Sequence, residues 1–461
     1  MNAITVIGGG YVGLITSAGF ARLGHQVYCL EIDHTRADLL REDRLPIKEP
    51  GLGELWERGR ESGRLKVTNS YREALRDSAF VFLAVGTPSR SNGSVDLRQV
   101  ISAVRSVADS WRAAEPPVIV LKSTVPPGTA ELVADVWREH RAGEEARVVS
   151  NPEFLREGQA VFDFMRPTRI VIGAGDRETA EKVAALYEGL RRPVVYTSTR
   201  AAEMIKYASN AFLCTKVSFI NEIAALCEEI GVDVVDVSEA LGMDPRVGSS
   251  YLEAGLGWGG SCLPKDIGGL IWSASRLGVH TPVLSAAVKI NKRQVRLVAS
   301  RLQSLVGDLA GKTIAVWGLA FKPNCDDIRE SPALALLRLL GQSGCKIRAY
   351  DPLAMDETAK LFPEVEYCAG PYEAATGADA IVLATAWSHF QSLDFDRLRA
   401  LVRRPLILDG RNVLDGVAAT DAGFIYVGIG RAVTGPEFEP EIKDLLPHIK
   451  RPRPRSKARV G

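Results

Sequence analysis

The feature that most constrains the fold is a strand, turn, helix and strand pattern at the start of the chain. Residues 3–7 form a β-rich run that leads into a glycine-rich turn, Gly8–Gly13. A helical pattern follows over residues 14–23, and a second β-rich run over 26–30 ends in Glu31. This pattern is typical of the βαβ unit that binds dinucleotides, with GxGxxG at its first turn. A glycine-rich turn in some other α/β protein is the alternative interpretation.

The glycines and the acid of this unit have separate roles. Glycine has no Cβ, so the turn can approach a pyrophosphate at the positive end of the following helix. Glu31 stands where an acid receives the ribose hydroxyls, and its charge would repel the 2′-phosphate of NADP. The unit therefore predicts NAD as the cofactor, and Arg36 weakens the preference over NADP slightly. The expected contacts of the turn are Gly8, Gly10, Tyr11, Val12 and Gly13.

Strand and helix patterns alternate through most of the chain. Buried-strand runs over 79–85, 118–121 and 148–149 each end in small polar residues, proline and glycine. In an open parallel sheet these three loops should meet at the carboxyl edge, although each taken alone is an ordinary turn. The alternation returns in a later part of the chain without GxGxxG, in runs over residues 312–317, 346–350, 380–383 and 406–408.

These patterns predict an α/β protein with two Rossmann-like doubly wound domains joined by a central region of long helices. The predicted domains are a dinucleotide-binding domain over 1–200 and a helical region over 201–305 that carries a cysteine loop and forms a homodimer. A second Rossmann-like domain follows over 311–440. Residues 441–461 form a basic tail that is predicted to be disordered.

The composition excludes several classes of protein. A net charge of +1 argues against nucleic-acid and membrane partners, and the alternative is that the basic tail alone contacts such a partner. The seven cysteines are scattered without a CxxC pair, which favours free thiols in a reducing compartment and no metal site. No apolar run reaches the roughly 18 residues that span a bilayer, and no signal peptide is evident. We therefore expect a cytoplasmic protein.

A cysteine loop over residues 257–266 is the strongest candidate for catalysis. Three glycines precede Cys262, and Lys265 and Asp266 follow it. A cysteine reacts as the thiolate, so a cation such as Lys265 would activate Cys262 by lowering its pKa, while Asp266 could accept a proton or hold a water. The alternative is a surface turn with a buried structural cysteine.

Two further pairs of residues have a spacing that suits a site. Lys206 and Asn210 are one turn apart in a helix predicted over 201–230, where the alternative is the wet edge of an amphipathic helix. Glu153 and Glu157 would share a face if their segment is helical, and two such carboxylates could handle protons and position water. The alternative is a pair of solvent-exposed acids.

Ordered motifs cover residues 3–415. They are GxGYVG at 8–13, VGTP at 85–88, STVxPGT at 123–129, NPEFLREG at 151–158, AEMIKYxxNAF at 202–212, FINEI at 219–223, GGSCxPKD at 259–266 and FK…DDxRE at 321–330. In this order the chain resembles the UDP-glucose/GDP-mannose dehydrogenases. The resemblance implies two successive NAD-dependent oxidations of the C6 hydroxyl of a nucleotide sugar, with the first domain holding NAD and the last holding the nucleotide sugar.

The resemblance also implies roles for individual residues. Cys262 would add to the intermediate aldehyde, so that the second oxidation gives a thioester for water to hydrolyse. Lys206 and Asn210 would stabilise the charge on the C6 oxygen, and Asp266 with Thr124 and Glu153 would position water. Further implied cofactor contacts are Thr87, Thr124, Glu157, Lys265 and Arg329. Implied substrate contacts are Glu153, Phe154, Leu155, Arg156, Glu157, Lys206, Asn210, Arg246, Tyr251, Leu252, Glu253, Ala254, Gly255, Gly259, Phe321, Lys322 and Arg411, with Arg246 reaching the site of a partner subunit.

The choice of substrate depends on details of these motifs. Trp258, Glu31 and Ala386 depart from the commonest residues of the family, and Ala386 slightly weakens the choice of UDP-glucose. Segments 244–248, 349–352 and 409–412 resemble UDP-glucose members, so UDP-glucose is favoured over GDP-mannose or another UDP-sugar. A dehydrogenase that removes one hydride per substrate, and an NAD-sensing or nucleic-acid-binding protein that uses the tail, are the remaining alternatives.

Overall fold

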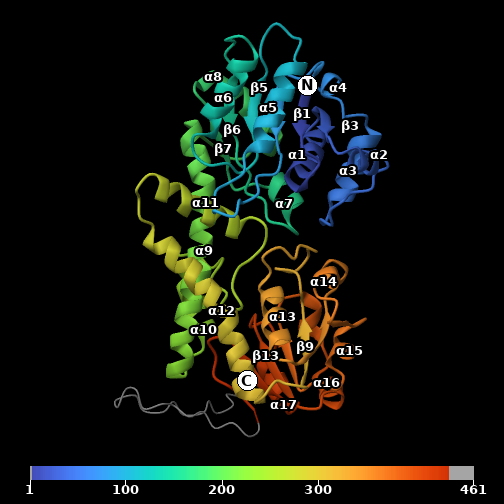
Figure 1. The fold of residues 1–461 in the computed structure, drawn as a ribbon, viewed down its shortest axis with the longest axis vertical. Helices are drawn as coiled ribbons and strands as arrows, with labels where there is room; N and C mark the ends of the chain where they lie inside the picture. Colours follow the sequence, from blue (N-terminus) through green and yellow to red (C-terminus); the bar gives the residue numbers. More distant parts are fainter. Residues whose placement is uncertain (1–2, 436–461) are drawn as a thin grey trace, which may run out of the picture. The chain divides into compact units, whose positions relative to one another are not determined.

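The computed structural model describes residues 3–435, which form two compact units. Unit 1 comprises residues 3–214, 260–285 and 323–327, and unit 2 comprises residues 215–259, 286–322 and 328–435. Helix α9 (Thr199–Ile230), drawn in green in Figure 1, begins in unit 1 and ends in unit 2. The tail predicted over 441–461 lies outside the described residues.

Unit 1 is built on one eight-stranded sheet in the order β3-β2-β1-β4-β5-β6-β7-β8. All neighbouring strands are parallel except β6 and β7, which are antiparallel. The strands are β1 (Ala3–Ile7), β2 (Gln26–Leu30), β3 (Leu65–Thr68), β4 (Phe80–Leu83), β5 (Val118–Leu121), β6 (Arg147–Ser150), β7 (Ile170–Gly173) and β8 (Val194–Thr197).

Helices cover both faces of this sheet. One buried cluster packs α1, α3, α7 and α8 on one face, and a second packs α4, α5 and α6 on the other. Such two-sided burial is what apolar runs like Phe80–Leu83 require. The helices are α1 (Tyr11–Arg22), α2 (His34–Arg41), α3 (Leu52–Glu61), α4 (Tyr71–Leu75), α5 (Arg98–Ser110), α6 (Thr129–His140), α7 (Ala160–Met165), α8 (Arg177–Ala185), η1 (Glu188–Leu190) and α11 (Leu263–Arg276).

The carboxyl ends of the central strands meet as the sequence predicts. Strands β4, β5 and β6 are parallel neighbours, so the loops that follow them lie along one edge of the sheet. Two hydroxyls join the first two loops: Thr87 Oγ1 donates to the carbonyl of Thr124 over 2.9 Å, and Ser123 Oγ donates to that of Val85 over 2.6 Å. These two loops carry Thr87 and Thr124, two of the predicted cofactor residues.

Unit 2 contains a six-stranded parallel sheet in the order β11-β10-β9-β12-β13-β14. Its strands are β9 (Thr313–Trp317), β10 (Lys346–Tyr350), β11 (Glu366–Tyr367), β12 (Ala380–Leu383), β13 (Leu406–Asp409) and β14 (Ile425–Gly428). Its helices are the second part of α9, α10 (Val234–Met243), the greater part of α12 (Pro282–Val306), α13 (Pro332–Gln342), α14 (Met355–Leu361), α15 (Pro371–Ala375), η2 (Ser388–Ser392), α16 (Phe395–Leu401) and α17 (Gly416–Asp421). The predicted class, α/β with two Rossmann-like sheets and a long linking helix, is confirmed.

The acid at the end of β10 is fully engaged within unit 2. Asp351 Oδ2 accepts hydrogen bonds from the amides of Leu319 and Ala320 and from the Trp387 indole over 2.7–3.1 Å. Its Oδ1 accepts from two more amides, those of Leu353 and Ala354, over 2.9 Å each. Asp351 is wholly buried, so these five donors replace the water that a carboxylate needs.

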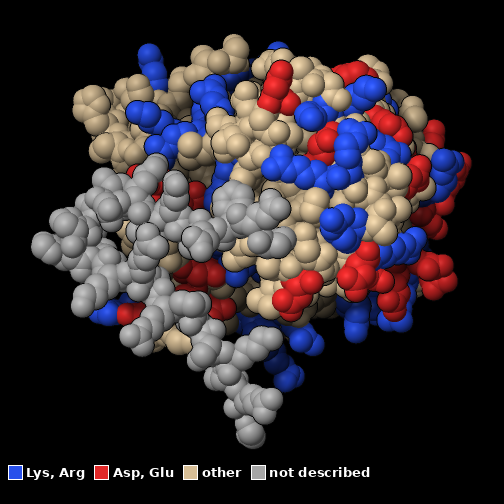
Figure 2. Space-filling model, turned by 90° about the horizontal axis from the view of Figure 1, so that it is seen from below, with Lys and Arg blue, Asp and Glu red and all other residues tan. Residues whose placement is uncertain are grey.

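The surface is mixed in charge. On the face shown in Figure 2, acidic and basic side chains lie interspersed, as the nearly balanced numbers of 57 Lys and Arg and 56 Asp and Glu would suggest. Within residues 3–435, no helix has the length and apolar character needed to cross a membrane.

Candidate active site

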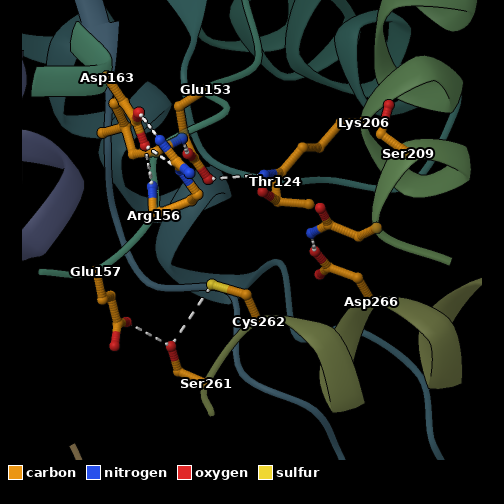
Figure 3. Close-up of polar contacts among 12 residues, drawn as sticks. Thr124, Glu153, Arg156, Glu157, Asp163, Lys206, Ser209, Ser261, Cys262 and Asp266 are labelled. Atoms are coloured by element: carbon orange, nitrogen blue, oxygen red, sulfur yellow. Dashed lines mark hydrogen bonds and ion pairs between the residues drawn. The ribbon is translucent and has the colours of Figure 1, made fainter. Parts of the chain in front are cut away.

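The cysteine loop places Cys262 at the start of a helix. Cys262 is the N-cap residue of α11, and its carbonyl accepts a hydrogen bond from the amide of Asp266 over 2.9 Å. Its side chain is exposed, and Ser261 Oγ lies 3.5 Å from Sγ and donates to Glu157 Oε1 over 3.0 Å (Figure 3). A thiol at a helix N-terminus is placed to gain from the positive end of the helix dipole.

The charges around Cys262 act in opposite directions. Solvent reaches the side chain, yet the protein around it is dense, and this burial raises the pKa of the thiol to about 11. The carboxylate of Glu153 raises the pKa further, whereas the ammonium of Lys206 lowers it. The activation of Cys262 by Lys265 stays a prediction. Lys265 Nζ pairs with Asp266 Oδ1 over 2.5 Å, and Lys206 is the cation that favours the thiolate most.

Lys206 forms a buried ion pair with Glu153. Their side chains are only 4% and 6% exposed, and Nζ lies 3.0 Å from Oε1. Burial acts to lower the pKa of Lys206, but the carboxylates of Glu153 and Asp266 outweigh it, so the pKa lies above its usual value. Lys206 therefore carries its positive charge at neutral pH, which suits a group that stabilises negative charge rather than one that accepts a proton.

Asn210 and Asp266 form a second buried contact beside this pair. Asn210 Nδ2 donates to Asp266 Oδ2 over 2.6 Å, and Lys265 holds the other carboxylate oxygen. Asp266 has no exposed surface. Lys206 and Asn210 lie on one face of α9, as their spacing predicts, and each contacts a carboxylate, Lys206 that of Glu153 and Asn210 that of Asp266. Unit 1 thus brings together Glu153, Lys206, Asn210, Cys262 and Asp266.

The two glutamates of the NPEFLREG segment do not share a helix face. Residues 151–158 are irregular, and Glu153 Oε2 accepts from the amide of Leu155 over 2.5 Å, which makes a local turn. Glu153 consequently faces Lys206, whereas Glu157 faces Ser261. The condition for a shared helix face, a helical segment, is therefore not met. Arg156 pairs with Asp163, and Phe154 lies 5.4 Å from Lys206 Nζ in cation–π contact.

The glycine-rich turn has the features that a dinucleotide needs. Gly8 has a φ of +111°, and a Cβ at Gly13 would collide with the carbonyl of Gly8, so both positions require glycine. Gly10 begins α1 without a side-chain cap, which leaves the first-turn amides for an anion. The turn therefore fits a pyrophosphate.

The predicted ribose acid is held at the end of β2. Glu31 is 5% exposed, and its Oε2 accepts from the amide of Gly9 over 2.9 Å. Arg36 lies 3.4 Å from the same oxygen, so the guanidinium that could attract a 2′-phosphate is already paired. Tyr11 points elsewhere, since its hydroxyl bonds to Glu49, whose carboxylate also accepts from the amide of Gly158.

The predicted substrate residues 251–255 lie in unit 2 with Arg411. Gly255 approaches Gly410 so closely that a Cβ would meet its carbonyl, and a Cβ at Gly259 would likewise meet Glu330. Arg411 donates to the carbonyl of Gly257 over 2.9 Å, and burial lowers the pKa of its guanidinium to about 10. Leu252 and Ala254 are buried, Glu253 is exposed and Tyr251 is half-buried.

Four further predicted residues are Arg246, Phe321, Lys322 and Arg329. Arg246 is exposed and pairs with Asp244 two positions earlier. Lys322 lies 5.3 Å from the ring of Phe321, and Arg329 is exposed.

Three contacts were not expected from the sequence. Asn221 is buried and accepts from the amide of Gly255 over 2.8 Å, and Lys216 donates to the carbonyls of Val247, Gly248 and Ser250. Glu49 joins the glycine-rich turn to the loop at Gly158. A buried asparagine within FINEI could have indicated the first contact, but the other two join segments far apart in the sequence.

The dinucleotide-binding sheet and the grouping of a cysteine, a lysine and carboxylates define a dehydrogenase with two Rossmann-like folds. Comparison with known proteins gives matches in sequence order. Residues 2–191 match the NAD binding domain of the UDP-glucose/GDP-mannose dehydrogenase family, residues 200–293 its central domain and residues 315–416 its UDP binding domain. The chain belongs to the UDP-glucose/GDP-mannose dehydrogenase family.

Individual relatives match over nearly their full length. A UDP-glucose 6-dehydrogenase of Pseudomonas aeruginosa is 44% identical over 446 residues, which cover 94% of this chain and 98% of the relative. One of Rhizobium meliloti is 43% identical and covers 93% and 99%. The structure of a UDP-glucose dehydrogenase from Pyrobaculum islandicum superposes with a TM-score of 0.88 at 40% identity and covers 94% of this chain and 98% of that one.

Proposed function

We propose that the protein oxidises the C6 hydroxyl of UDP-glucose to a carboxylate with two molecules of NAD, giving UDP-glucuronate. The observation that carries this proposal is the placement of an accessible cysteine, Cys262, beside a buried lysine, Lys206, and two carboxylates. An enzyme that removes one hydride has no use for a thiol there, whereas the oxidation of an alcohol twice can use one to add to the intermediate aldehyde. The full-length similarity to proteins named UDP-glucose 6-dehydrogenase supports this choice of sugar nucleotide.

An aldehyde gives up a second hydride only after a nucleophile has added to its carbonyl carbon, and the thiol of Cys262 would be that nucleophile. NAD, when bound by the glycine-rich turn, would supply the hydride acceptor for each of the two oxidations. Between them, the sulfur of Cys262 adds to the aldehyde carbon, and the carbonyl electron pair moves to oxygen, which takes up the thiol proton. Loss of the second hydride and the hydroxyl proton leaves a thioester. Water then adds, the C–S bond breaks, and the thiol is released with the carboxylate.

Lys206 and Asn210 would stabilise the negative charge that develops on the C6 oxygen. Lys206 is charged at neutral pH and lowers the pKa of Cys262, so the same ammonium would favour both the thiolate and the oxyanion. The amide of Asn210 uses one proton for Asp266 and has a second to donate.

Asp266, Glu153 and Thr124 would position the hydrolytic water. The two oxygens of Asp266 already accept from Asn210 and Lys265, which suits a fixed carboxylate that orients its neighbours. Thr124 is fixed through its carbonyl by Thr87 on the neighbouring loop. These contacts support a preorganised site rather than one assembled around the substrate.

Each predicted domain would have a separate function. Residues 1–200 would bind NAD, 201–305 would carry the cysteine loop and form a homodimer, and 311–440 would bind the sugar nucleotide. The exposed Arg246 would complete the site of the partner subunit. The cofactor contacts would be Thr87, Glu157, Lys265 and Arg329. The substrate contacts would be the predicted residues of the NPEFLREG segment and of 251–255, together with Gly259, Phe321, Lys322 and Arg411. The free cysteines of the described residues support a reducing, cytoplasmic location.

The test is the amount of NADH formed per sugar nucleotide consumed, with UDP-glucose and GDP-mannose offered separately. We expect two NADH per UDP-glucose and none from GDP-mannose. Two NADH from GDP-mannose alone would keep the thioester route and change the substrate, and one NADH from either sugar would refute the route.

The thiol is tested by Cys262→Ser. We expect this variant to lose about 10³-fold or more of steady-state oxidation, because a serine hydroxyl is a far weaker nucleophile at neutral pH. Cys345→Ser is the matched control, since Cys345 lies in unit 2 and its sulfur donates to the carbonyl of Leu340. Near-normal oxidation by Cys262→Ser would remove Cys262 from the mechanism.

A further inference from the structure

A second buried glutamate lies on the same helix as the proposed catalytic lysine. Glu203 precedes Lys206 on α9 by about one turn and is 3% exposed. A carboxylate with so little access to water must find its hydrogen-bond donors within the protein. The donors of Glu203 come from two segments that are distant in the sequence from α9.

The first segment is the start of helix α6. Glu203 Oε2 accepts from the amide of Gly128 over 2.7 Å, and Oε1 accepts from that of Ala130 over 2.9 Å. No side chain of the residue before α6 caps this helix, so Glu203 provides the cap from 73 to 75 residues away. The negative charge of Glu203 also suits the positive end of the helix dipole. The loop held in this way contains Thr124.

The second segment is the end of strand β6. Ser150 Oγ donates to Glu203 Oε1 over 3.0 Å, and the chain continues from Ser150 into the loop that carries Glu153. At the same place α9 approaches the sheet closely, because a Cβ at Gly173 would collide with Ala202 and Ser198. One carboxylate therefore contacts the segments that lead to Thr124 and Glu153 and belongs to the helix that carries Lys206.

We infer that Glu203 is a positioning residue that fixes the Lys206–Glu153 pair beside Cys262 by tying α9 to the start of α6 and to the end of β6. This inference assigns a role to Glu203 within the proposed function and rests on it. Glu203 does not touch the reacting atoms; it acts through the three segments that it joins. Burial raises the pKa of Glu203 to about 7, opposed by the donors from Gly128, Ser150 and Ala130.

The substitution Glu203→Gln tests the need for two accepting oxygens. A glutamine keeps the size but turns an NH₂ group toward an amide or hydroxyl that must donate, so at least one contact is lost. Glu203→Asp keeps both oxygens on a shorter side chain, so it should retain part of the kcat and of the thiol reactivity that Glu203→Gln loses. Glu131→Gln is the matched control, because Glu131 also joins α6 to α9, through Arg200, but at the exposed surface.

Two measurements separate positioning from folding. With UDP-glucose, we expect Glu203→Gln to lower kcat by about 10–100-fold with little change in KM, as a shift of about 1 Å in catalytic groups would do. Without any substrate, we expect iodoacetamide to alkylate Cys262 about tenfold more slowly at pH 8, the decrease in thiolate caused by one unit of pKa. Thermal unfolding confirms that each variant is folded at the assay temperature.

The alkylation measurement separates this inference from the proposed function. If the wild-type protein fails to oxidise UDP-glucose but Glu203→Gln slows alkylation, the proposed substrate falls and the positioning role stands. A folded Glu203→Gln protein with the kcat and the alkylation profile of Glu131→Gln would overturn the inference. If Glu203→Gln does not fold, Glu203→Asp decides by the same two measurements, and wild-type values in it would overturn the inference.

Discussion

Replacing Lys206 by methionine should cost both stability and thiol reactivity. The substitution keeps most of the length of the side chain and removes the ammonium that lies 3.0 Å from Glu153 in a site where both partners are nearly inaccessible to water. An exposed ion pair is worth about 0–1 kcal/mol. Breaking a buried pair costs about 3–5 kcal/mol, because the remaining carboxylate is left without a partner. We therefore expect the free energy of unfolding to fall by about 3–5 kcal/mol.

The same substitution acts on Cys262. The thiol pKa is about 11 with the help of Lys206, so roughly one thiol in 10³ is ionised at pH 8. Without the ammonium the pKa should rise by a unit or more, and the alkylation rate at pH 8 should fall at least about tenfold. Urea unfolding and a pH series of iodoacetamide reaction rates measure the two effects.

A control and a second variant make the result decisive. Lys182→Met removes the exposed pair with Glu178 and should change the stability by less than about 0.5 kcal/mol. Adding Glu153→Gln to Lys206→Met should recover most of the lost stability, because no unpaired charge then remains in the interior. A Lys206→Met protein with the stability and thiol pKa of the wild type would refute the interpretation of Lys206 as the charged partner of both groups.

Two other predictions concern the cofactor and pH. Glu31→Gln should raise the ratio of kcat/KM for NADP to that for NAD by about tenfold or more, because it removes a repelling charge and releases Arg36 to meet a 2′-phosphate; an unchanged ratio would contradict the role of Glu31. The raised pKa of Glu203, about 7 against an ordinary value of 4.5, means that the folded protein holds this proton more tightly than the unfolded chain. The contribution of this proton to the free energy of unfolding is complete below pH 4.5 and is lost as the pH rises through about 7. Glu203→Gln should remove this part of the pH dependence in urea unfolding, and identical pH profiles would contradict it.

The sequence predicts those parts of the fold that depend on local apolar runs. Strands β1, β2, β5, β10 and β12 have the predicted bounds, because each is a short buried run that ends beside glycine, charge or turn residues. Helix α1 begins at Tyr11, three residues before the predicted start, since the glycine-rich turn itself makes the first turn of the helix. Short strands such as β3 and β11 lack a distinct apolar run and were not predicted.

The site was less predictable because its contacts join distant segments. Lys265 is three residues from Cys262 in sequence and pairs with Asp266, whereas Lys206 acts on the thiol from 56 residues away. The four-residue spacing of Glu153 and Glu157 predicts a shared face only in a helix, and the turn made by Glu153 with Leu155 excludes one. The direction of a side chain in an irregular segment depends on tertiary contacts that spacing does not reveal.

The carboxylate of Asp351 is saturated with hydrogen-bond donors, so the sheet of unit 2 cannot bind a dinucleotide in the way predicted for the sheet of unit 1. A carboxylate offers about four lone-pair positions, and Asp351 already accepts five donors, whereas Glu31 at the matching place in unit 1 accepts from two amides and a more distant guanidinium. Engineering a GxGxxG turn into residues 318–323 would therefore not create a second dinucleotide site. Within residues 3–435, the two sheets share a strand order around their first strand, but the acid at this position has capacity for a sugar hydroxyl in unit 1 and not in unit 2.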